Sequence, residues 1–111
     1  MERIKIIRYP NPAEVGKAGA AFFSKQALHS VKQSGRFLAA ISGGSTPIEM
    51  FKQLAQTSQR QSIPWEQSHI FWCDERLVPP NHPESNYHAA NQHFLSKCTV
   101  PAMNIHRIHG E

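Results

Sequence analysis

The stretch ISGGSTPIEMF (Ile41 to Phe51) places two glycines, a serine, a threonine and a proline between an apolar run and a helix-like segment. The start of a helix attracts anions because its first backbone NH groups have no partner inside the helix. Gly43 and Gly44 would allow an anion to approach the backbone closely. The stretch matches neither the G-x-x-x-x-G-K-[ST] motif that binds nucleoside triphosphates nor the G-x-G-x-x-G motif that binds dinucleotides. We therefore predict a site for a phosphate monoester.

A plain helix start explains part of the same stretch. Thr46 at the N-cap, Pro47 at the first helical position and Glu49 at the third would form a capping box. This interpretation gives no reason for Gly43 and Gly44. We expect Glu49 to point outward, because a carboxylate turned inward would repel a phosphate.

A second cluster, CDER, combines acidic and basic groups. Arg76 could hold a phosphate through two parallel hydrogen bonds. Asp74 could orient a sugar hydroxyl or move a proton, whereas Glu75 should point to the opposite side of the strand and serve the structure. An ordinary solvated ion pair is the alternative interpretation.

Other catalytic and metal-binding patterns are weak. The chain has seven histidines, but their intervals match no recognised set of metal ligands. No Gly-x-Ser-x-Gly motif is present. Cys73 and Cys98 belong to no paired metal spacing and no disulfide framework, and we expect both to be reduced and structural. We therefore expect no metal and no cofactor.

The elements that would position these groups alternate along the chain. We expect strands at Arg3–Tyr9, Arg36–Ser42, His69–Glu75 and, at the end, Met103–His109, with helices at Ala13–Ser34, Pro47–Ser58 and Asn86–Lys97. RQSIPWEQS reads as a connector and RLVPPNHPES as a loop. This order predicts an α/β fold, a Rossmann-like three-layer arrangement in which a parallel sheet has helices on both faces.

This order has a consequence for the two clusters. In open α/β sheets, ligands bind beyond the carboxyl ends of the strands. The second and third strands would deliver the Gly43–Thr46 turn and the Asp74–Arg76 cluster to that same edge.

Composition limits the remaining possibilities. A chain of 111 residues fits a single domain, 1–111. Its net charge of +4 favours anionic partners, but the twelve Lys and Arg are scattered, so we expect a small anion and no nucleic acid. No apolar stretch approaches the roughly 20 residues of a membrane span, so we expect no membrane contact and a cytoplasmic location.

Three motifs together resemble those of a known family. SGGSTP (Ser42 to Pro47), DERLVP (Asp74 to Pro79) and SNY (Ser85 to Tyr87) resemble the N-terminal half of 6-phosphogluconolactonases. The resemblance implies hydrolysis of 6-phosphogluconolactone to 6-phosphogluconate in the oxidative pentose phosphate pathway. It also implies that Asp74 lines the sugar site as the catalytic candidate, and that the substrate is held by Gly43, Gly44, Ser45, Thr46 and Arg76.

One part of the family pattern is absent from this sequence. In these lactonases the general base is a histidine of a Gly-x-Asp-Gly-His segment in the C-terminal half, and no such segment occurs here. We therefore expect the sheet to be incomplete at the C-terminus and a C-terminal half to be missing. The chain would carry only the phosphate-binding half of the site, and we expect its activity alone to be low.

Two other functions fit the same motifs. Glucosamine-6-phosphate deaminases share a Gly-Gly-Thr-Pro turn and an Asp-Glu pair, but have an aromatic residue in place of Arg76, and there the residue matching Asp74 is the proton-transfer base. A non-catalytic sugar-phosphate-binding domain is the other alternative.

Overall fold

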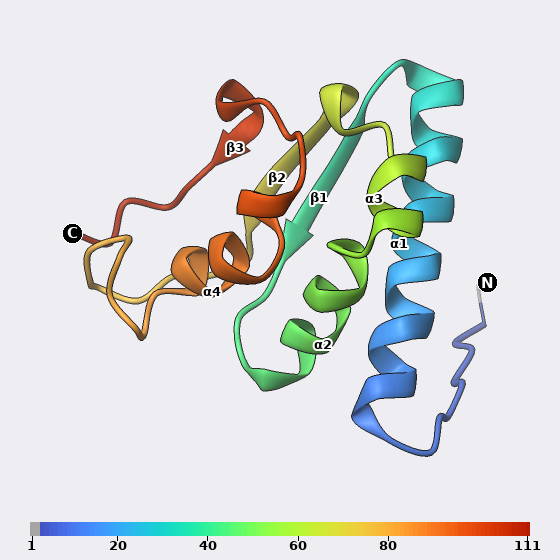
Figure 1. Ribbon diagram of the computed structural model, residues 1–111, viewed down its shortest axis with the longest axis horizontal. Coiled ribbons are helices and arrows are strands. Elements are labelled where there is room, and N and C mark those ends of the chain that lie inside the picture. The colour runs from blue at the N-terminus through green and yellow to red at the C-terminus, as the bar shows by residue number, and fades with distance from the viewer. Residues whose placement is uncertain (1–2) are drawn as a thin grey trace.

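Three parallel strands form a sheet in which spatial order follows chain order (Figure 1). The computed structural model describes residues 3–111, and its strands are β1 (Phe37–Ile41), β2 (Ser68–Trp72) and β3 (Ile105–His106). β1 pairs with β2 along its whole length, whereas β3 pairs with β2 only through Ile105 and His106. The parallel α/β architecture predicted from the sequence is confirmed.

Four helices and three short 3-10 turns connect and flank the strands. They are α1 (Pro12–Ser34), α2 (Ser45–Leu54), α3 (Thr57–Ser62) and α4 (Asn86–His93), with η1 (Trp65–Gln67), η2 (Leu95–Lys97) and η3 (Ala102–Asn104). The first predicted helix is confirmed, and its ends have clear causes. The Asn11 side chain accepts a hydrogen bond of 2.9 Å from the backbone NH of Glu14, and Gly35 ends the helix in the left-handed conformation.

The second and third predicted helices were too long. α2 ends at Leu54, and α3 begins inside the predicted helix and runs into the predicted connector. Gln56 causes the break, because its backbone is extended (φ −70°, ψ 146°) while its carbonyl already accepts the first bond of α3 from Arg60. α4 ends at His93 because the backbone of Phe94 (φ −147°, ψ −39°) leaves the helix.

The strand predicted at Arg3–Tyr9 is wrong. The segment is irregular, and the side chains of Ile4 and Ile6 are 91% and 77% exposed. It leads into the start of α1 and pairs with none of the three strands (Figure 1). Alternating apolar residues form a strand only when a neighbouring strand pairs with them. The predicted final strand was also too long, since β3 contains only Ile105 and His106.

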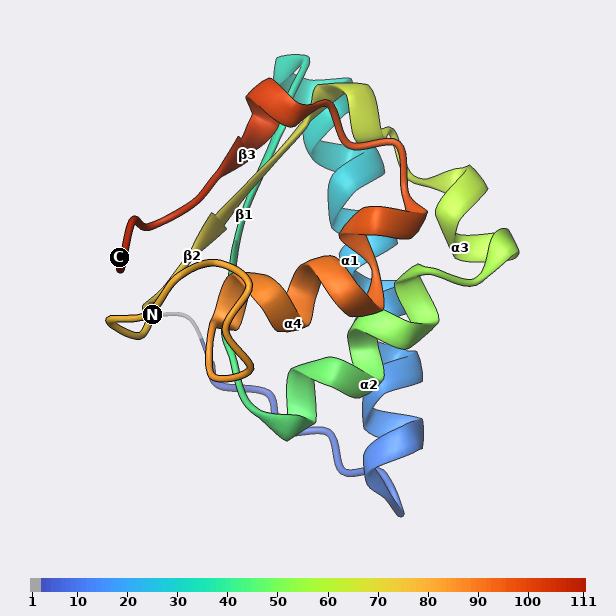
Figure 2. The same ribbon diagram turned by 60° about the vertical axis from the view of Figure 1, so that its left-hand side comes forward.

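The hydrophobic core lies between one face of the sheet and the helices. Phe51, Leu54, Ile70 and Phe94 are fully buried, and the rings of Phe51 and Phe94 lie 4.8 Å apart. All four helices lie on the same side of the sheet (Figure 2). We expected helices on both faces; within residues 3–111 they cover one face and leave the other bare.

Among the helices of residues 3–111, none combines the length and the apolar character that crossing a membrane requires.

Candidate functional site

The two predicted polar clusters follow adjacent strands at their carboxyl ends. β1 leads into residues 42–46, which we call the glycine turn, and β2 leads into residues 74–76. Because β1 and β2 are parallel neighbours, both leave the sheet at the same edge, which is the lower one in Figure 1. The strand order therefore brings the clusters together as the sequence predicts.

The packing of the glycine turn itself requires both of its glycines. Gly44 is the N-cap of α2 and has a φ of 99°, a conformation that disfavours residues with a Cβ. At Gly43, a Cβ would collide with the side chain of Asn86. The sequence argument for an anion site assigned neither of these roles to the glycines.

The predicted capping box is wrong. α2 begins at Ser45, so Thr46 and Pro47 lie inside its first turn. Within residues 3–111 no side chain caps that turn, and the Glu49 carboxylate pairs with Lys52 at 3.5 Å. The first NH groups of α2 therefore lack a side-chain acceptor and lie beside the exposed residues Ser45 and Thr46. An anion-binding helix start requires this arrangement.

Asn86 connects the two clusters. Its buried side chain lies against Gly43, and its Nδ2 donates a hydrogen bond of 3.2 Å to the backbone carbonyl of Asp74. The same Nδ2 lies 3.4 Å from the Asp74 carboxylate. One amide side chain thus fixes the distance between the glycine turn and the end of β2.

Glu75 holds the end of β2 to the start of α4. Its carboxylate accepts hydrogen bonds from the backbone NH groups of Asn86 (2.6 Å), Arg76 (2.8 Å) and Tyr87 (3.0 Å), and from the Ser85 hydroxyl (2.9 Å). Burial raises the pKa of this carboxyl, but these hydrogen bonds outweigh burial and hold the pKa below its ordinary value of 4.5. The structural role predicted for Glu75 agrees with these contacts.

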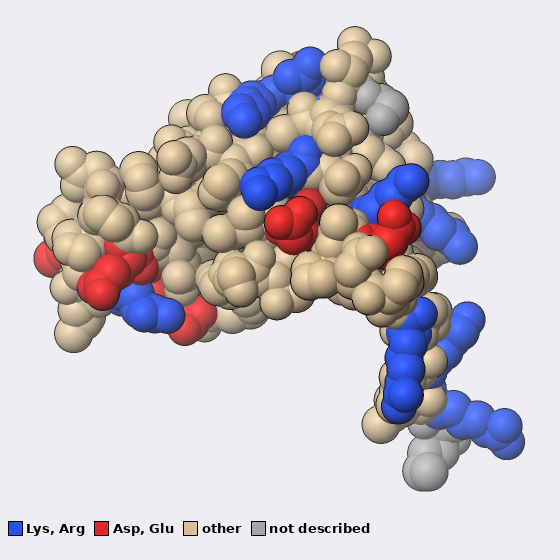
Figure 3. Space-filling view, turned by 60° about the horizontal axis from the view of Figure 1, so that its bottom comes forward, with Lys and Arg blue, Asp and Glu red and all other residues tan. Residues whose placement is uncertain are grey.

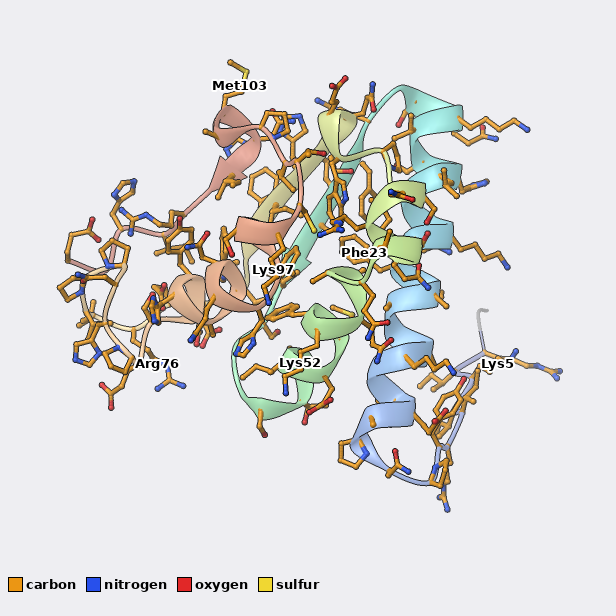
Figure 4. The ribbon with its side chains drawn as sticks, in the orientation of Figure 1. Lys5, Phe23, Lys52, Arg76, Lys97 and Met103 are labelled. Atoms are coloured by element: carbon orange, nitrogen blue, oxygen red, sulfur yellow. The ribbon has the colours of Figure 1, made fainter. Side chains whose placement is uncertain are left out.

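Asp74 and Arg76 present exposed side chains at this edge. Figure 4 shows Arg76 on the lower side of the molecule, the side on which α2 begins. Among the described residues no carboxylate forms an ion pair with Arg76. The guanidinium is therefore available to an anion from solvent.

The last residues of the chain lie against the same loop. A Cβ on Gly110 would collide with the backbone carbonyl of Arg76. The guanidinium of Arg107 lies 5.6 Å from the centre of the Tyr87 ring and pairs with Glu111 at 2.8 Å. Residues 107–111 thus leave the sheet and pass beside the candidate site, where we had predicted strand up to His109.

Histidines and cysteines add no further cluster to this edge. Within the described part of the chain, no three His, Cys, Asp or Glu side chains gather in a way that could hold a metal ion. Cys73 and Cys98 are both free, and Cys98 is partly buried while Cys73 is exposed. A structural role therefore suits Cys98 and not Cys73.

Basic side chains form no continuous stripe on the carboxyl edge. The face seen in Figure 3 carries Lys and Arg at several separate places, with acidic side chains between some of them.

Comparison with known proteins decides the family. The sequence model of the family described as glucosamine-6-phosphate isomerases/6-phosphogluconolactonase matches residues 10–111. The chain belongs to this family. It is 44% identical over 79 residues to a 6-phosphogluconolactonase of Nostoc, a match that covers 71% of this chain and 31% of that protein. It is 38% identical over 104 residues to the probable 6-phosphogluconolactonase 4 of Arabidopsis thaliana, covering 94% and 40%.

Solved structures agree with this assignment. The crystal structure of devB protein superposes with a TM-score of 0.82 at 40% identity, over 93% of this chain and 42% of that one. A putative 6-phosphogluconolactonase from Neisseria gonorrhoeae superposes with a TM-score of 0.71 at 30% identity, over 80% and 37%. The chain therefore spans well under half the length of the family members that it matches.

Sequence reasoning did not assign a role to Asn86. The residue was noticed only as part of the SNY motif, because its function depends on a contact with Gly43 that is distant in sequence. One local signal was present, since Ser85 stands three residues before His88 and its hydroxyl caps α4 by accepting the His88 NH at 3.1 Å. The predicted helix began at Asn86, as α4 does, but a cap at Ser85 indicates no partner for the Asn86 side chain.

Proposed function

We propose that this chain supplies the phosphate-binding part of a 6-phosphogluconolactonase site. In the complete site, water would attack the carbonyl carbon of 6-phosphogluconolactone. The ring C–O bond would break, and the products would be a carboxylate and a hydroxyl group, as in 6-phosphogluconate. Family membership supports this reaction, and so do the names of the relatives at 38–44% identity. The pentose phosphate pathway and a cytoplasmic location belong to the same proposal.

The observation that carries the proposal is the contact of Asn86 with both clusters. Its side chain touches Gly43 and donates to Asp74. A ligand bound at the uncapped start of α2 would therefore lie close to the residues that follow β2. Without this link, the two motifs could serve unrelated purposes.

Each candidate residue has a role that follows from its chemistry. Phosphate oxygens would accept hydrogen bonds from the backbone NH groups of Gly43, Gly44, Ser45 and Thr46, at the positive end of the helix dipole. The Arg76 guanidinium would add charge-assisted hydrogen bonds to the same phosphate. Asp74 would accept a hydrogen bond from a sugar hydroxyl. The base that removes a proton from the attacking water would come from outside these 111 residues.

Binding of the product tests the proposal directly. Calorimetric titration of the chain with 6-phosphogluconate should show binding, and unphosphorylated gluconate should bind at least about tenfold more weakly. Arg76→Ala removes at least one charge-assisted hydrogen bond worth roughly 1.5 to 3 kcal/mol, so affinity should fall by at least about tenfold.

Arg36→Ala provides the matched control, because Arg36 is an exposed arginine before the amino end of β1, at the opposite edge of the sheet. This variant should bind 6-phosphogluconate as the parent chain does. Equal affinity for gluconate, or an Arg76→Ala variant with unchanged affinity, would contradict the proposal. Preference for glucosamine 6-phosphate over 6-phosphogluconate would instead favour a deaminase site.

A further inference from the structure

The Asn86 side chain makes two contacts with one residue, Asp74. Its Nδ2 donates a hydrogen bond of 3.2 Å to the backbone carbonyl of Asp74 and lies 3.4 Å from the carboxylate oxygen Oδ1 of the same residue. The first contact fixes the amide against the backbone, and the second reaches the side chain. A single NH₂ group therefore links the main chain of Asp74 to its own carboxylate, and this link favours one rotamer of the Asp74 side chain.

Only one orientation of the Asn86 amide fits these neighbours. A flip of the amide would exchange Oδ1 and Nδ2, and Oδ1 would then face two acceptors of Asp74 and no donor. In the observed orientation, Oδ1 is the Asn86 atom nearest to the position that a Cβ of Gly43 would take. The donor side of the amide is thus committed to Asp74.

Asn86 itself is firmly held. It is 6% exposed and is the first residue of α4. Its backbone NH donates a hydrogen bond of 2.6 Å to the Glu75 carboxylate, and the Ser85 hydroxyl before it caps the helix. Asn86 can therefore act as a fixed anchor for a neighbouring side chain.

Asp74, by contrast, is exposed to solvent. An exposed carboxylate that no neighbour holds samples several staggered rotamers, and a ligand that needs one of them must order the side chain when it binds. The Asn86 amide removes part of that cost before the ligand arrives. An ionised carboxylate has roughly four acceptor positions, so the contact with Asn86 leaves room for hydroxyl donors of a ligand.

We propose that Asn86 is a positioning residue that sets the orientation of the Asp74 carboxylate, and that through Asp74 it makes the site select phosphate esters whose carbon chain carries hydroxyl groups. The inference rests on the proposed function, which assigns Asp74 to the hydroxyl groups and the glycine turn with Arg76 to the phosphate. The Asn86 donor then contributes to affinity for the hydroxyl-bearing part of the ligand and not to affinity for its phosphate.

Nuclear magnetic resonance tests the orientation without any ligand. In the parent chain, the three-bond couplings between the α and β protons of Asp74 should indicate one staggered rotamer. Asn86→Asp keeps the size of the side chain beside Gly43 but replaces the donor by a second carboxylate, which repels that of Asp74. In this variant the couplings should indicate averaging or a different rotamer. Averaged couplings in the parent chain would overturn the proposal.

Ligand discrimination tests the consequence. The probes are glucitol 6-phosphate and methyl phosphate, two phosphate monoesters of equal charge of which only the first has hydroxyl groups. Calorimetric titration gives the ratio of their affinities. Asp74→Ala should lower this ratio by at least about tenfold, because a hydroxyl loses a charged acceptor. Asn86→Asp should lower it by about 3- to 10-fold, as expected when one side chain must be ordered on binding. Repulsion of the phosphate by the new carboxylate acts on both probes and cancels in the ratio.

A double-mutant cycle shows whether Asn86 acts through Asp74. In the Asp74→Ala background, Asn86→Asp should leave the ratio unchanged, since the residue that Asn86 positions is absent. Asn91→Asp is the matched control, because it places the same charge on the same helix, and it should leave the ratio of the parent chain unchanged. Circular dichroism checks that each variant is folded. Asn86→Ala, which removes the same donor without adding charge, takes the place of Asn86→Asp if that variant does not fold.

A ratio that Asn86→Asp leaves unchanged would overturn the proposal, and so would an equal fall in the Asp74→Ala background. An equal fall for Asn91→Asp would also overturn it, because added charge would then be the cause. Failure of the proposed function has a different signature, since the parent chain would then bind 6-phosphogluconate no better than gluconate. That result would overturn both proposals, whereas the results above overturn this one alone.

Discussion

At the scale of single residues, one carboxylate organises the candidate site without pointing into it. Glu75 accepts four hydrogen bonds, three from backbone NH groups and one from the Ser85 hydroxyl. The backbone NH groups of Arg76 and Asn86 thus donate to the same carboxylate, which holds the two segments together. Hydrogen bonds to a charged acceptor are stronger than neutral ones, so the site depends on the ionised state of Glu75.

Glu75→Gln should destabilise the chain at pH 7 and make its stability less dependent on acid. The pKa of Glu75 is lowered in the folded state, so its contribution is complete above the ordinary value of 4.5 and is lost as pH falls through the lowered value. We expect a loss of roughly 2 kcal/mol in the free energy of unfolding at pH 7 and a smaller loss at pH 3, which lies below the ordinary value of 4.5. Urea unfolding at both pH values measures this difference.

The control for this measurement is Glu66→Gln, because Glu66 is exposed and its carboxylate makes no hydrogen bond within residues 3–111. Its unfolding curves should match those of the parent chain. A Glu75→Gln variant whose deficit is the same at pH 3 and pH 7 would show that the ionised carboxylate is not what stabilises the start of α4.

At the scale of elements, the start of α2 depends on a neighbour that comes from α4. Gly43 has no Cβ because the Asn86 side chain fills that space. A substitution at Gly43 should therefore displace the Asn86 side chain, and a substitution at Asn86 should change the packing of the glycine turn. The functional consequence is that the geometry of the first turn of α2 is fixed by α4 as well as by its own sequence.

A double-mutant cycle measures that dependence. Gly43→Ala should cost about 2 kcal/mol or more in unfolding free energy, because the new methyl group collides with Asn86. In the Asn86→Ala background the same change should cost at least about 1 kcal/mol less, since the colliding side chain is gone. Thermal or urea unfolding of the four chains gives the coupling energy. Additive losses would show that the contact with Asn86 is not what makes a larger residue at position 43 costly.

The elements also show which parts of the fold the sequence could predict. α1 was placed almost correctly because its periodicity and its terminal glycine, Gly35, are both local signals. The strand at Arg3–Tyr9 was wrong because its alternation has no partner strand in residues 3–111. The break at Gln56 and the N-cap at Gly44 were missed because a single backbone rotation decides each, and the residue types there permit both conformations.

The candidate site followed the same rule. That the glycine turn and the Asp74–Arg76 cluster would share an edge was predictable from the order of strands and helices. The Asn86 contact and the passage of residues 107–111 beside Arg76 were not, because both depend on tertiary packing. The roles of Asp74, Arg76 and the turn residues in binding stay predictions until a ligand is titrated.

At the scale of the whole molecule, the two faces of the sheet differ in how far their side chains are buried. The helix-covered face contains the buried aromatic core, whereas the other face exposes apolar side chains. The two cysteines differ in their exposure to solvent. The Cys98 thiol lies 3.9 Å from the carbonyl oxygen of Leu54 and is partly buried, whereas Cys73 is exposed. Burial raises the pKa of the Cys98 thiol to about 11, so it stays protonated at neutral pH.

Thiol labelling tests this asymmetry. At pH 8 a disulfide reagent should modify Cys73 at least about tenfold faster than Cys98, because only the thiolate reacts and Cys98 is both shielded and protonated. The Cys73→Ser and Cys98→Ser variants assign the two rates, and in urea the rates should converge. Equal rates in the native chain would mean that the core around Cys98 opens far more often than its packing indicates.

The passage of the last residues beside Arg76 affects how the protein should be handled. Gly110 lies directly against the backbone of Arg76, so anything attached after Glu111 starts beside the phosphate-binding candidates. The opposite end of the described chain lies beyond α1, away from that edge (Figure 1). An affinity tag or fluorophore joined at the amino end would leave the site clear, whereas one joined at the carboxyl end would crowd it.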